Sequence, residues 1–273
     1  MITLAQALSS GVGIERKFTC PVHRDVNPSA SVNILKGVWY CYRCHAHGTV
    51  DGAVYDDMDD DTFATALERL VGEEEHEFHP ESWLDQFDAG LACEYWLSRF
   101  EPETVSHFRL GYDAVRDAAT YALRDPAGRV LGVVRRSLAG GTKYRYPRHV
   151  KTNDLLFNYQ AVSVEAVLLT EGATDAMALW EAGFRAETGW LALATFSNRI
   201  SASQAHLLAR LGPSRIVIAY DDDEPGSAGA MQVAALLATD YDLSRPVFPR
   251  HAKDMADLSV AQRREAVEQA IAL

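Results

Sequence analysis

Four residues near the N-terminus have the types and the spacing of metal ligands. They form two pairs, each with two intervening residues, and seventeen residues separate the pairs. The set consists of Cys20, His23, Cys41 and Cys44. Three thiolates and one imidazole complete a tetrahedral Zn²⁺ shell and leave no open position for catalysis. The sequence therefore predicts a structural zinc site.

Other Cys and His residues close to this motif are weaker candidates. His45 and His47 are near enough to be rival ligands, but they follow Cys44 too closely to displace the simpler set. Cys93 lies in an expected helix beside Tyr95 and is interpreted as a buried thiol. Four cysteines in a chain of this length favour metal binding over a disulfide framework.

Acidic residues recur in the C-terminal part of the chain, each time beside a short apolar run. Glu171 follows residues 167–170, and Asp175 comes four residues later. One further group follows residues 216–220, and another follows residues 247–248. These two groups contain Asp221, Asp222, Asp223, Asp254 and Asp257. If the apolar runs are neighbouring parallel strands, their carboxyl ends bring the acids to one edge of the sheet.

Such a cluster has a defined chemistry. Carboxylate oxygens are the ligands that hard divalent cations prefer, so the cluster predicts a catalytic Mg²⁺ or Mn²⁺ site. Two such ions can activate a 3′-hydroxyl and stabilise a pyrophosphate leaving group.

A basic tract precedes the acidic groups. The chain has a net charge of −12, yet residues 109–151 contain ten Lys or Arg against three Asp. The candidates for contacts to a triphosphate or a template are Arg135, Arg136, Lys143 and Arg145. Side chains alternate along a strand, so only one of the two adjacent arginines can point into a given groove.

The elements that must position these residues fall into successive zones. We expect a zinc-binding domain at 1–75, an acidic linker at 76–82, a basic subdomain at 83–163 and an α/β domain at 164–273. The first zone should contain strand, turn and strand between the ligand pairs. The expected helices are 62–71, 83–100, 174–182 and 226–239, with capping boxes opening two more at 201–204 and 259–262. The expected strands are 120–124, 129–136, 143–146, 167–170 and 216–220. The predicted fold class is α/β, or α+β overall.

The sequence also bears on where in the cell the protein is found. No apolar run approaches the roughly 20 residues of a membrane span. The N-terminus lacks the basic start and apolar stretch of a secretion signal, which predicts a cytoplasmic protein.

With these motifs in place, the chain resembles the DnaG-type bacterial and phage primases along nearly all of its length. The zinc motif continues as His45-Ala46-His47-Gly48, and the acidic groups read Glu171-Gly172 and Asp221-Asp222-Asp223. The resemblance implies a zinc-ribbon domain, a basic mixed-sheet subdomain and a TOPRIM α/β domain. It also implies synthesis of RNA primers on single-stranded DNA from ribonucleoside triphosphates.

The resemblance also implies roles for individual residues. The zinc ligands would be Cys20, His23, Cys41 and Cys44; the catalytic metals would be held by Glu171, Asp221, Asp223 and Asp254 with support from Asp175. Arg136 matches the arginine that ends the family's glycine-rich strand, and Lys143 matches the lysine of its lysine-tyrosine pair.

The chain departs from the family pattern at several places. Asp222 stands where the family often has Gly, and the last motif delays its second acid to Asp257. The helicase-binding domain of cellular primases has no counterpart, which favours a phage or mobile-element primase whose helicase is supplied separately. Three alternatives stay open: a RecR-like DNA-binding scaffold without catalysis, a TOPRIM nuclease, and a primase relic that only binds DNA.

Overall fold

The structure is a computed structural model. It describes residues 2–3, 15–24, 28–33, 38–51, 78–92, 94–148, 150–250 and 252–273. Two compact units make up the chain, Met1–His76 and Glu77–Leu273. The helix expected at 62–71 and the thiol Cys93 lie outside the described residues.

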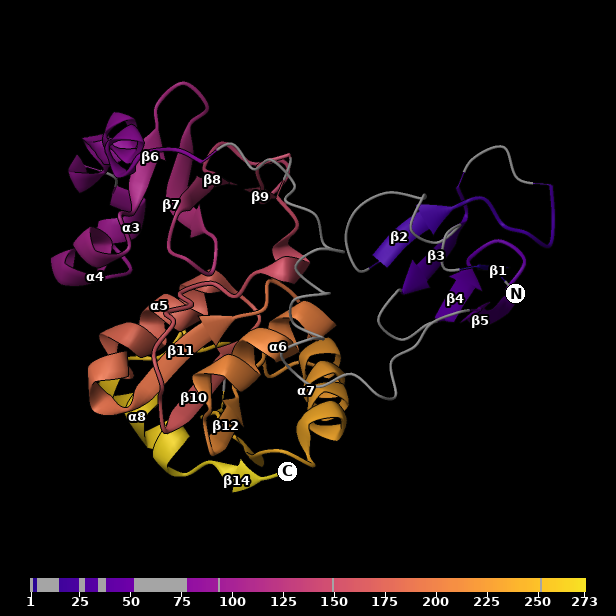
Figure 1. Ribbon diagram of the computed structural model, residues 1–273. Coiled ribbons are helices and arrows are strands. Elements are labelled where there is room, and N and C mark those ends of the chain that lie inside the picture. The colour runs from indigo at the N-terminus through magenta and orange to yellow at the C-terminus, as the bar shows by residue number, and fades with distance from the viewer. Residues whose placement is uncertain are drawn as a thin grey trace. The chain divides into compact units, whose positions relative to one another are not determined.

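The first unit is built on a five-stranded sheet with the order β1-β5-β4-β3-β2 (Figure 1). Its strands are β1 (Ile2–Thr3), β2 (Glu15–Phe18), β3 (Ala30–Asn33), β4 (Val38–Cys41) and β5 (His47–Asp51). Strands β3 and β4 pair antiparallel, which confirms the two strands predicted between the ligand pairs, whereas the turn predicted between them lies outside the described residues. Val32 and Trp39 pack with Cys20 and Cys41 in a small core, so packing joins the two segments that carry the ligands.

The second unit begins with helical segments. They are the 3₁₀ helix η1 (Glu81–Ala92) and the α-helices α3 (Glu94–Leu97) and α4 (Pro102–His107). The single helix expected at 83–100 is therefore wrong in detail, and Gly90 within it disfavours a continuous α-helix. His79 forms a bridge with Val130, so the end of the expected linker belongs to this unit.

A four-stranded antiparallel sheet with the order β6-β7-β8-β9 follows. Its strands are β6 (Gly111–Asp113), β7 (Ala118–Arg124), β8 (Val130–Ser137) and β9 (Tyr144–Arg145). The predicted hairpin between β7 and β8 is confirmed, and its turn is closed by the N–H of Gly128, which donates to the carbonyl oxygen of Asp125 at 2.9 Å. Gly128 has a φ of 83°, a conformation that glycine adopts without strain.

The remainder, joined through the 3₁₀ turn η2 (Thr152–Asp154), forms a second sheet with the order β11-β10-β12-β13-β14. Its strands are β10 (Ala166–Thr170), β11 (Trp190–Ala194), β12 (Arg215–Ile218), β13 (Asp242–Arg245) and β14 (Ile271–Ala272). Its helices are α5 (Ala173–Glu181), η3 (Ala186–Thr188), α6 (Ala202–Leu211), α7 (Glu224–Leu237) and α8 (Val260–Glu268). The first four strands in this order are parallel, and β14 is antiparallel to β13. Both predicted capping boxes open helices, at Ser201 for α6 and Ser259 for α8.

One expected strand position is wrong. The acidic group around Asp254 follows β13, whereas the sequence pattern favoured Val247 and Phe248. Prolines flank those two residues and lack the N–H that a sheet ladder needs, while β13 contains a single apolar residue, Leu243. The strand β11 was not predicted either, because a short apolar run does not distinguish strand from helix.

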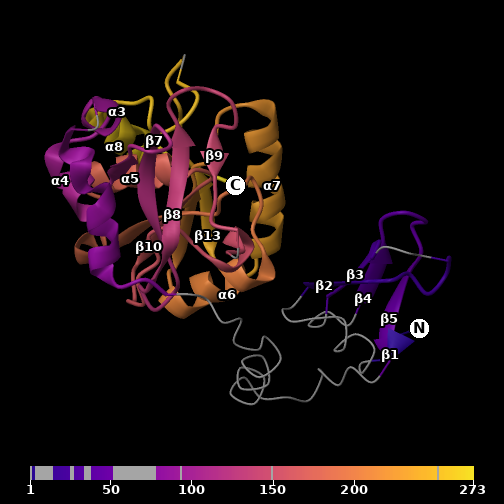
Figure 2. The ribbon, with the colours of Figure 1, turned by 90° about the horizontal axis from the view of Figure 1, so that it is seen from above.

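Two layers of helices cover the second sheet. Helices α5 and α8 share one hydrophobic cluster with one face of the sheet, and α6 and α7 share a second cluster with the other face (Figures 1 and 2). The first cluster also includes Trp96 of α3 and Tyr121 and Val134 of the antiparallel sheet, so both sheets of this unit share a core. No helix within the described ranges is long and apolar enough to cross a bilayer.

Candidate functional site

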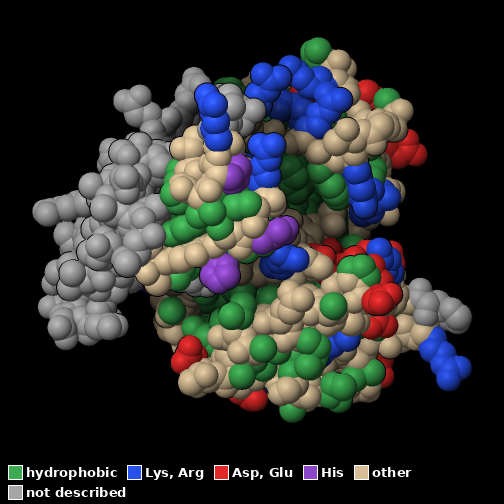
Figure 3. Space-filling model, turned by 90° about the vertical axis from the view of Figure 1, so that its right-hand side faces the viewer, with side chains coloured by type: hydrophobic (Ala, Val, Ile, Leu, Met, Phe, Trp, Pro, Cys, Tyr) green, Lys and Arg blue, Asp and Glu red, His purple; other side chains and the backbone are tan. Residues whose placement is uncertain are grey.

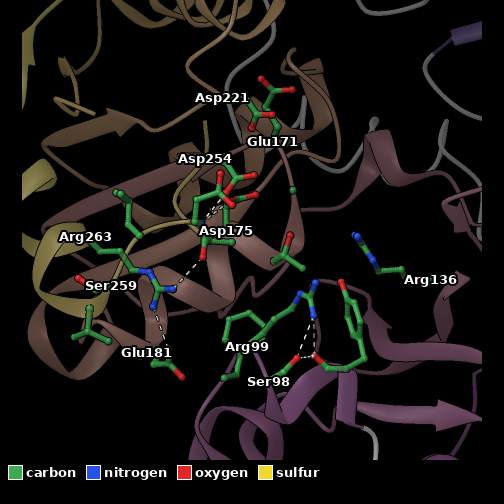
Figure 4. A pocket seen from close by; sticks show the side chains of 18 of the residues that line it. Ser98, Arg99, Arg136, Glu171, Asp175, Glu181, Asp221, Asp254, Ser259 and Arg263 are labelled. Atoms are coloured by element: carbon green, nitrogen blue, oxygen red, sulfur yellow. Dashed lines mark hydrogen bonds and ion pairs between the residues drawn. The ribbon is translucent and has the colours of Figure 1, made fainter. Parts of the chain in front are cut away.

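The predicted acidic residues of β10 and β12 lie at adjacent strand ends. Leu169 in β10 is in register with Ile218 in β12; Glu171 follows β10 directly, and Asp221 comes three residues after the end of β12. Glu171, Asp175, Asp221 and Asp254 line one cavity of about 610 Å³. Figure 4 shows these four side chains on the same side of the cavity. The parallel pairing of β10 and β12 thus brings together acids that are 50 residues apart.

Burial and mutual repulsion dominate the electrostatics of this cluster. Burial, then the charge of Asp221, raises the pKa of Glu171 to about 7. Burial, then the charge of Asp254, raises the pKa of Asp175 to about 8. Burial also raises the pKa of both Asp221 and Asp254, each with a further contribution from a neighbouring carboxylate. A bound cation would offset this repulsion.

The residues present fit a divalent cation in their donor chemistry. All are oxygen donors, and Oε1 of Glu171 is buried without a hydrogen-bond partner among the described atoms. The carboxylates are not drawn together into a closed shell, however. In the part of the chain that the structure describes, only the Cys/His set has three or more candidate ligand atoms that all lie within 4.8 Å of one another.

Lys253 supplies positive charge within this cluster. Its Nζ lies 3.1 Å from Oδ2 of Asp223 and 3.7 Å from Oδ2 of Asp221. The backbone N–H of Gly226 and the ammonium of Lys253 together lower the pKa of Asp223, so this carboxylate is ionised beside its more buried neighbours. Asp223 also caps α7 by accepting the N–H of Gly226 at 2.9 Å.

The middle aspartate of the triplet is paired elsewhere. Arg245 of β13 donates from Nη2 to Oδ1 of Asp222 at 3.0 Å and to Oγ of Ser227 at 3.0 Å. The residue that departs from the family's usual Gly is therefore neutralised by an arginine. Asp257, whose part was doubtful from the sequence, lines the same cavity, and its N–H donates to Oδ1 of Asp254 at 2.9 Å.

The antiparallel sheet contributes a basic and aromatic wall to the cavity. Arg136, Lys143 and Tyr144 line it, and Nη1 of Arg136 donates to the hydroxyl of Tyr144. Arg135 and Arg145 do not line it. They are cross-strand partners in one register pair, while Arg136 and Tyr144 form the next, so alternation turns the two pairs to opposite faces.

Arg135, which faces away from the cavity, forms an ion pair with an aspartate. Arg135 Nε donates to Oδ2 of the buried Asp113 at 2.6 Å. Of the four basic residues predicted from the sequence, the structure thus places two at the cavity and two away from it.

Sequence reasoning missed two residues of this wall. Arg99 and Tyr95 line the cavity, and the guanidinium of Arg99 lies 3.9 Å from the centroid of the Tyr95 ring. The guanidinium of Arg136 lies 5.1 Å from the centroid of the same Tyr95 ring. The signal available in the sequence was the spacing of four between Tyr95 and Arg99 in a helical segment, because residues so spaced share a helix face. In a space-filling view, many Lys and Arg side chains gather on one stretch of the surface, and others lie directly beside Asp and Glu side chains (Figure 3).

The four zinc-ligand candidates of the first unit come together as predicted. Their ligand atoms lie within 4.8 Å of one another, with Sγ of Cys20 3.6 Å from Sγ of Cys44. Backbone N–H groups point at two of the sulfurs, from Val22 to Cys20 and from Arg43 to Cys41, both at 3.4 Å. Such donors stabilise thiolates, so the donor set fits Zn²⁺.

The rival histidines are engaged elsewhere. Nδ1 of His45 lies 2.6 Å from the hydroxyl of Tyr40, and Nδ1 of His47 lies 3.2 Å from the carbonyl oxygen of His45. Neither histidine belongs to the four-residue cluster.

Two family models match the regions of the chain that contain these residues. Residues 10–84 match the CHC2 zinc finger family, and residues 168–259 match the Toprim-like family. The DNA primase of Deinococcus radiodurans is 24% identical over 94% of this chain and 55% of its own length. The DNA primase of Helicobacter pylori strain J99 is 23% identical over 98% of this chain and 59% of its own length. The chain thus spans somewhat more than half of the curated relatives it matches.

Solved structures show the same fold. The zinc-binding and RNA polymerase domains of the Aquifex aeolicus primase superpose with a TM-score of 0.58 at 21% identity, covering 100% of this chain and 84% of that one. A DnaG primase catalytic domain bound to single-stranded DNA gives 0.57 at 19% identity over 70% of this chain and 77% of that one. Fold and sites define a protein that joins a CHC2-type zinc finger to a Toprim-like domain. The chain is a homologue of the DnaG-type primases.

Proposed function

We propose that this chain is a DNA-dependent RNA primase, which makes short RNA primers on a single-stranded DNA template by two-metal nucleotidyl transfer. One observation carries the proposal. A single cavity has oxygen donors on one wall and guanidinium, ammonium and aromatic groups on the other. A ribonucleoside triphosphate needs both, because its phosphates carry negative charge and its transfer requires divalent ions.

The residues of the cavity divide this chemistry between them. Glu171, Asp221 and Asp254 of the cavity, together with Asp223 next to it, would hold Mg²⁺ or Mn²⁺, which would lower the pKa of a primer 3′-hydroxyl and offset charge on the leaving group. Arg136, Lys143 and Arg99 would bind the triphosphate. The 3′-oxygen forms a bond to the α-phosphorus as the bond to the bridging oxygen breaks, and pyrophosphate leaves.

The first unit would contribute the template contact. Zinc would stabilise its sheet, residues 10–84 match the CHC2 zinc finger family, and the similar Aquifex aeolicus primase structure contains a zinc-binding domain. The proposed partners are single-stranded DNA, ribonucleoside triphosphates and a replicative helicase that is supplied separately.

Primer synthesis tests the proposal directly. The zinc-loaded chain is incubated with single-stranded DNA, labelled ribonucleotides and Mg²⁺ or Mn²⁺, and short RNA is resolved on a gel. Glu171→Gln should abolish the product, and the exposed Glu268→Gln should leave it unchanged. Firm DNA binding without synthesis in either metal would instead support the scaffold alternative.

A further inference from the structure

A buried ion pair between α8 and α5 lies beside the acidic cavity. Nη1 of Arg263 is 3.0 Å from Oε2 of Glu181, and their side chains are only 5% and 10% exposed. Figure 4 shows Arg263 between Glu181 and the group of Asp175 and Asp254. Burying two charges costs about as much as their attraction returns, so stability alone does not explain this pair.

The guanidinium of Arg263 holds the loop that carries Asp254. Nε donates to the carbonyl oxygen of Met255 at 2.9 Å, and Nη2 donates to that of Ala256 at 3.4 Å. The N–H of Ala256 in turn donates to Oδ1 of Asp175 at 3.0 Å. The side chain of Met255 is fully buried. The backbone next to Asp254 is therefore held from two sides.

The same guanidinium binds the helix that follows Glu171. Nη1 of Arg263 also donates to the carbonyl oxygen of Ala178 at 3.3 Å, within α5. Helix α5 begins two residues after Glu171, and both Ala178 and Glu181 belong to it. Arg263 thus links the loop of Asp254 to the rigid element that positions Glu171.

Glu181 extends the link to the basic subdomain. Its Oε1 accepts the backbone N–H of Glu101 at 2.7 Å and the hydroxyl of Thr104 at 3.0 Å. Glu101 directly precedes α4 and stands two residues after Arg99, which lines the opposite wall of the cavity. The pair of Arg263 and Glu181 therefore connects the acidic wall of the cavity, the segment that carries Arg99 on the basic wall, and the loop of Asp254.

We propose that Arg263, paired with Glu181, is a positioning residue that sets Asp254 relative to Glu171 for the binding of divalent ions. The inference rests on the proposed function. Arginine suits this role because its planar fork reaches four acceptors in two segments, the loop of Met255 and helix α5, whereas a lysine ammonium cannot span them in one plane. The open spacing of the carboxylates makes ion affinity sensitive to where the loop of Asp254 is held.

Binding of Mn²⁺ alone tests the inference without relying on primer synthesis. The zinc-loaded full chain is titrated with Mn²⁺ by electron paramagnetic resonance, and its unfolding midpoint is measured in parallel. Arg263→Met should weaken Mn²⁺ binding about 10- to 100-fold, the range for residues that orient metal ligands. Arg263→Lys should recover part of the loss. The matched control is Arg264→Met, because Arg264 is on the same helix and donates at 2.7 Å to the carbonyl oxygen of Ala182, the C-cap of α5, without a hydrogen bond to the loop.

The double variant Arg263→Met/Glu181→Gln separates positioning from folding. It removes the unpaired buried charge that the single variant leaves, so its unfolding midpoint should return toward that of the parent while Mn²⁺ binding stays weak. Parental Mn²⁺ affinity in this folded double variant would overturn the inference and leave the proposed function intact. A parent chain that binds no Mn²⁺ would overturn both.

Discussion

Replacing Glu171 by Gln should stabilise the chain in the absence of Mg²⁺ and Mn²⁺ while removing its response to them. The pKa of this carboxyl is raised from 4.5 to about 7, first by burial and then by Asp221. Above pH 7 the folded chain must hold an ionised group that it disfavours. Gln keeps the shape of the side chain and carries no charge.

The size of the effect follows from this pKa. A rise from 4.5 to about 7 corresponds to about 3 kcal/mol at most, and solvent around the partly exposed Glu171 reduces it to about 1–2 kcal/mol. The penalty is nearly absent at pH 4.5, grows as the pH rises toward 7 and is complete above that value. For a chain of this length, it corresponds to a rise in melting temperature of roughly 2–8 °C at pH 8.

Thermal unfolding followed by tryptophan fluorescence measures this rise. Four of the five tryptophans belong to the second unit, so the signal reports mainly on it. The buffer is depleted of other divalent ions but leaves the zinc bound, and Glu268→Gln is the control. Mn²⁺ should raise the melting temperature of the parent and not of Glu171→Gln. A variant less stable than the parent at pH 8, or one equally stabilised at pH 4.5, would refute the reasoning.

Three further predictions concern the same chain. Gly226→Ala places a Cβ 2.2 Å from the carbonyl oxygen of Asp221 and 2.9 Å from Oε1 of Glu171. The substitution should therefore lower the free energy of unfolding by about 1–3 kcal/mol and weaken Mn²⁺ binding about tenfold or more. Chemical denaturation and Mn²⁺ titration measure these two effects. Chelation of zinc should unfold the first unit, Met1–His76. The second unit is a separate compact body, so it should keep its near-ultraviolet circular dichroism and its Mn²⁺ binding. Unfolding of both units together would contradict this prediction. Because protons compete for Glu171, Mn²⁺ affinity should increase from pH 6 to pH 8 in calorimetric titrations, and a flat profile would show that this carboxyl is not a ligand.

Residue type and spacing were sufficient to predict those parts of the protein that are formed by residues close together in the sequence. The zinc set could be predicted because two short Cys/His pairs specify a tetrahedral site wherever the chain joins them, and the structure brings them together. The hairpin around Gly128 and the capping boxes at Ser201 and Ser259 were equally accessible, since their hydrogen bonds join residues three to four positions apart. The likeness to DnaG-type primases came from the same kind of local motif.

Only the tertiary structure decided which side chains share the cavity. Strand pairing places Arg135 beside Arg145, and both side chains lie on the face of the sheet opposite to Arg136. No local sequence pattern specifies this pairing register. Arg99 reaches the cavity from the turn after α3, outside the basic tract, and Arg263 makes its contacts with residues up to 85 positions away. The pKa of Glu171 is likewise a tertiary property, because burial and a neighbouring charge arise only when β10 and β12 lie side by side.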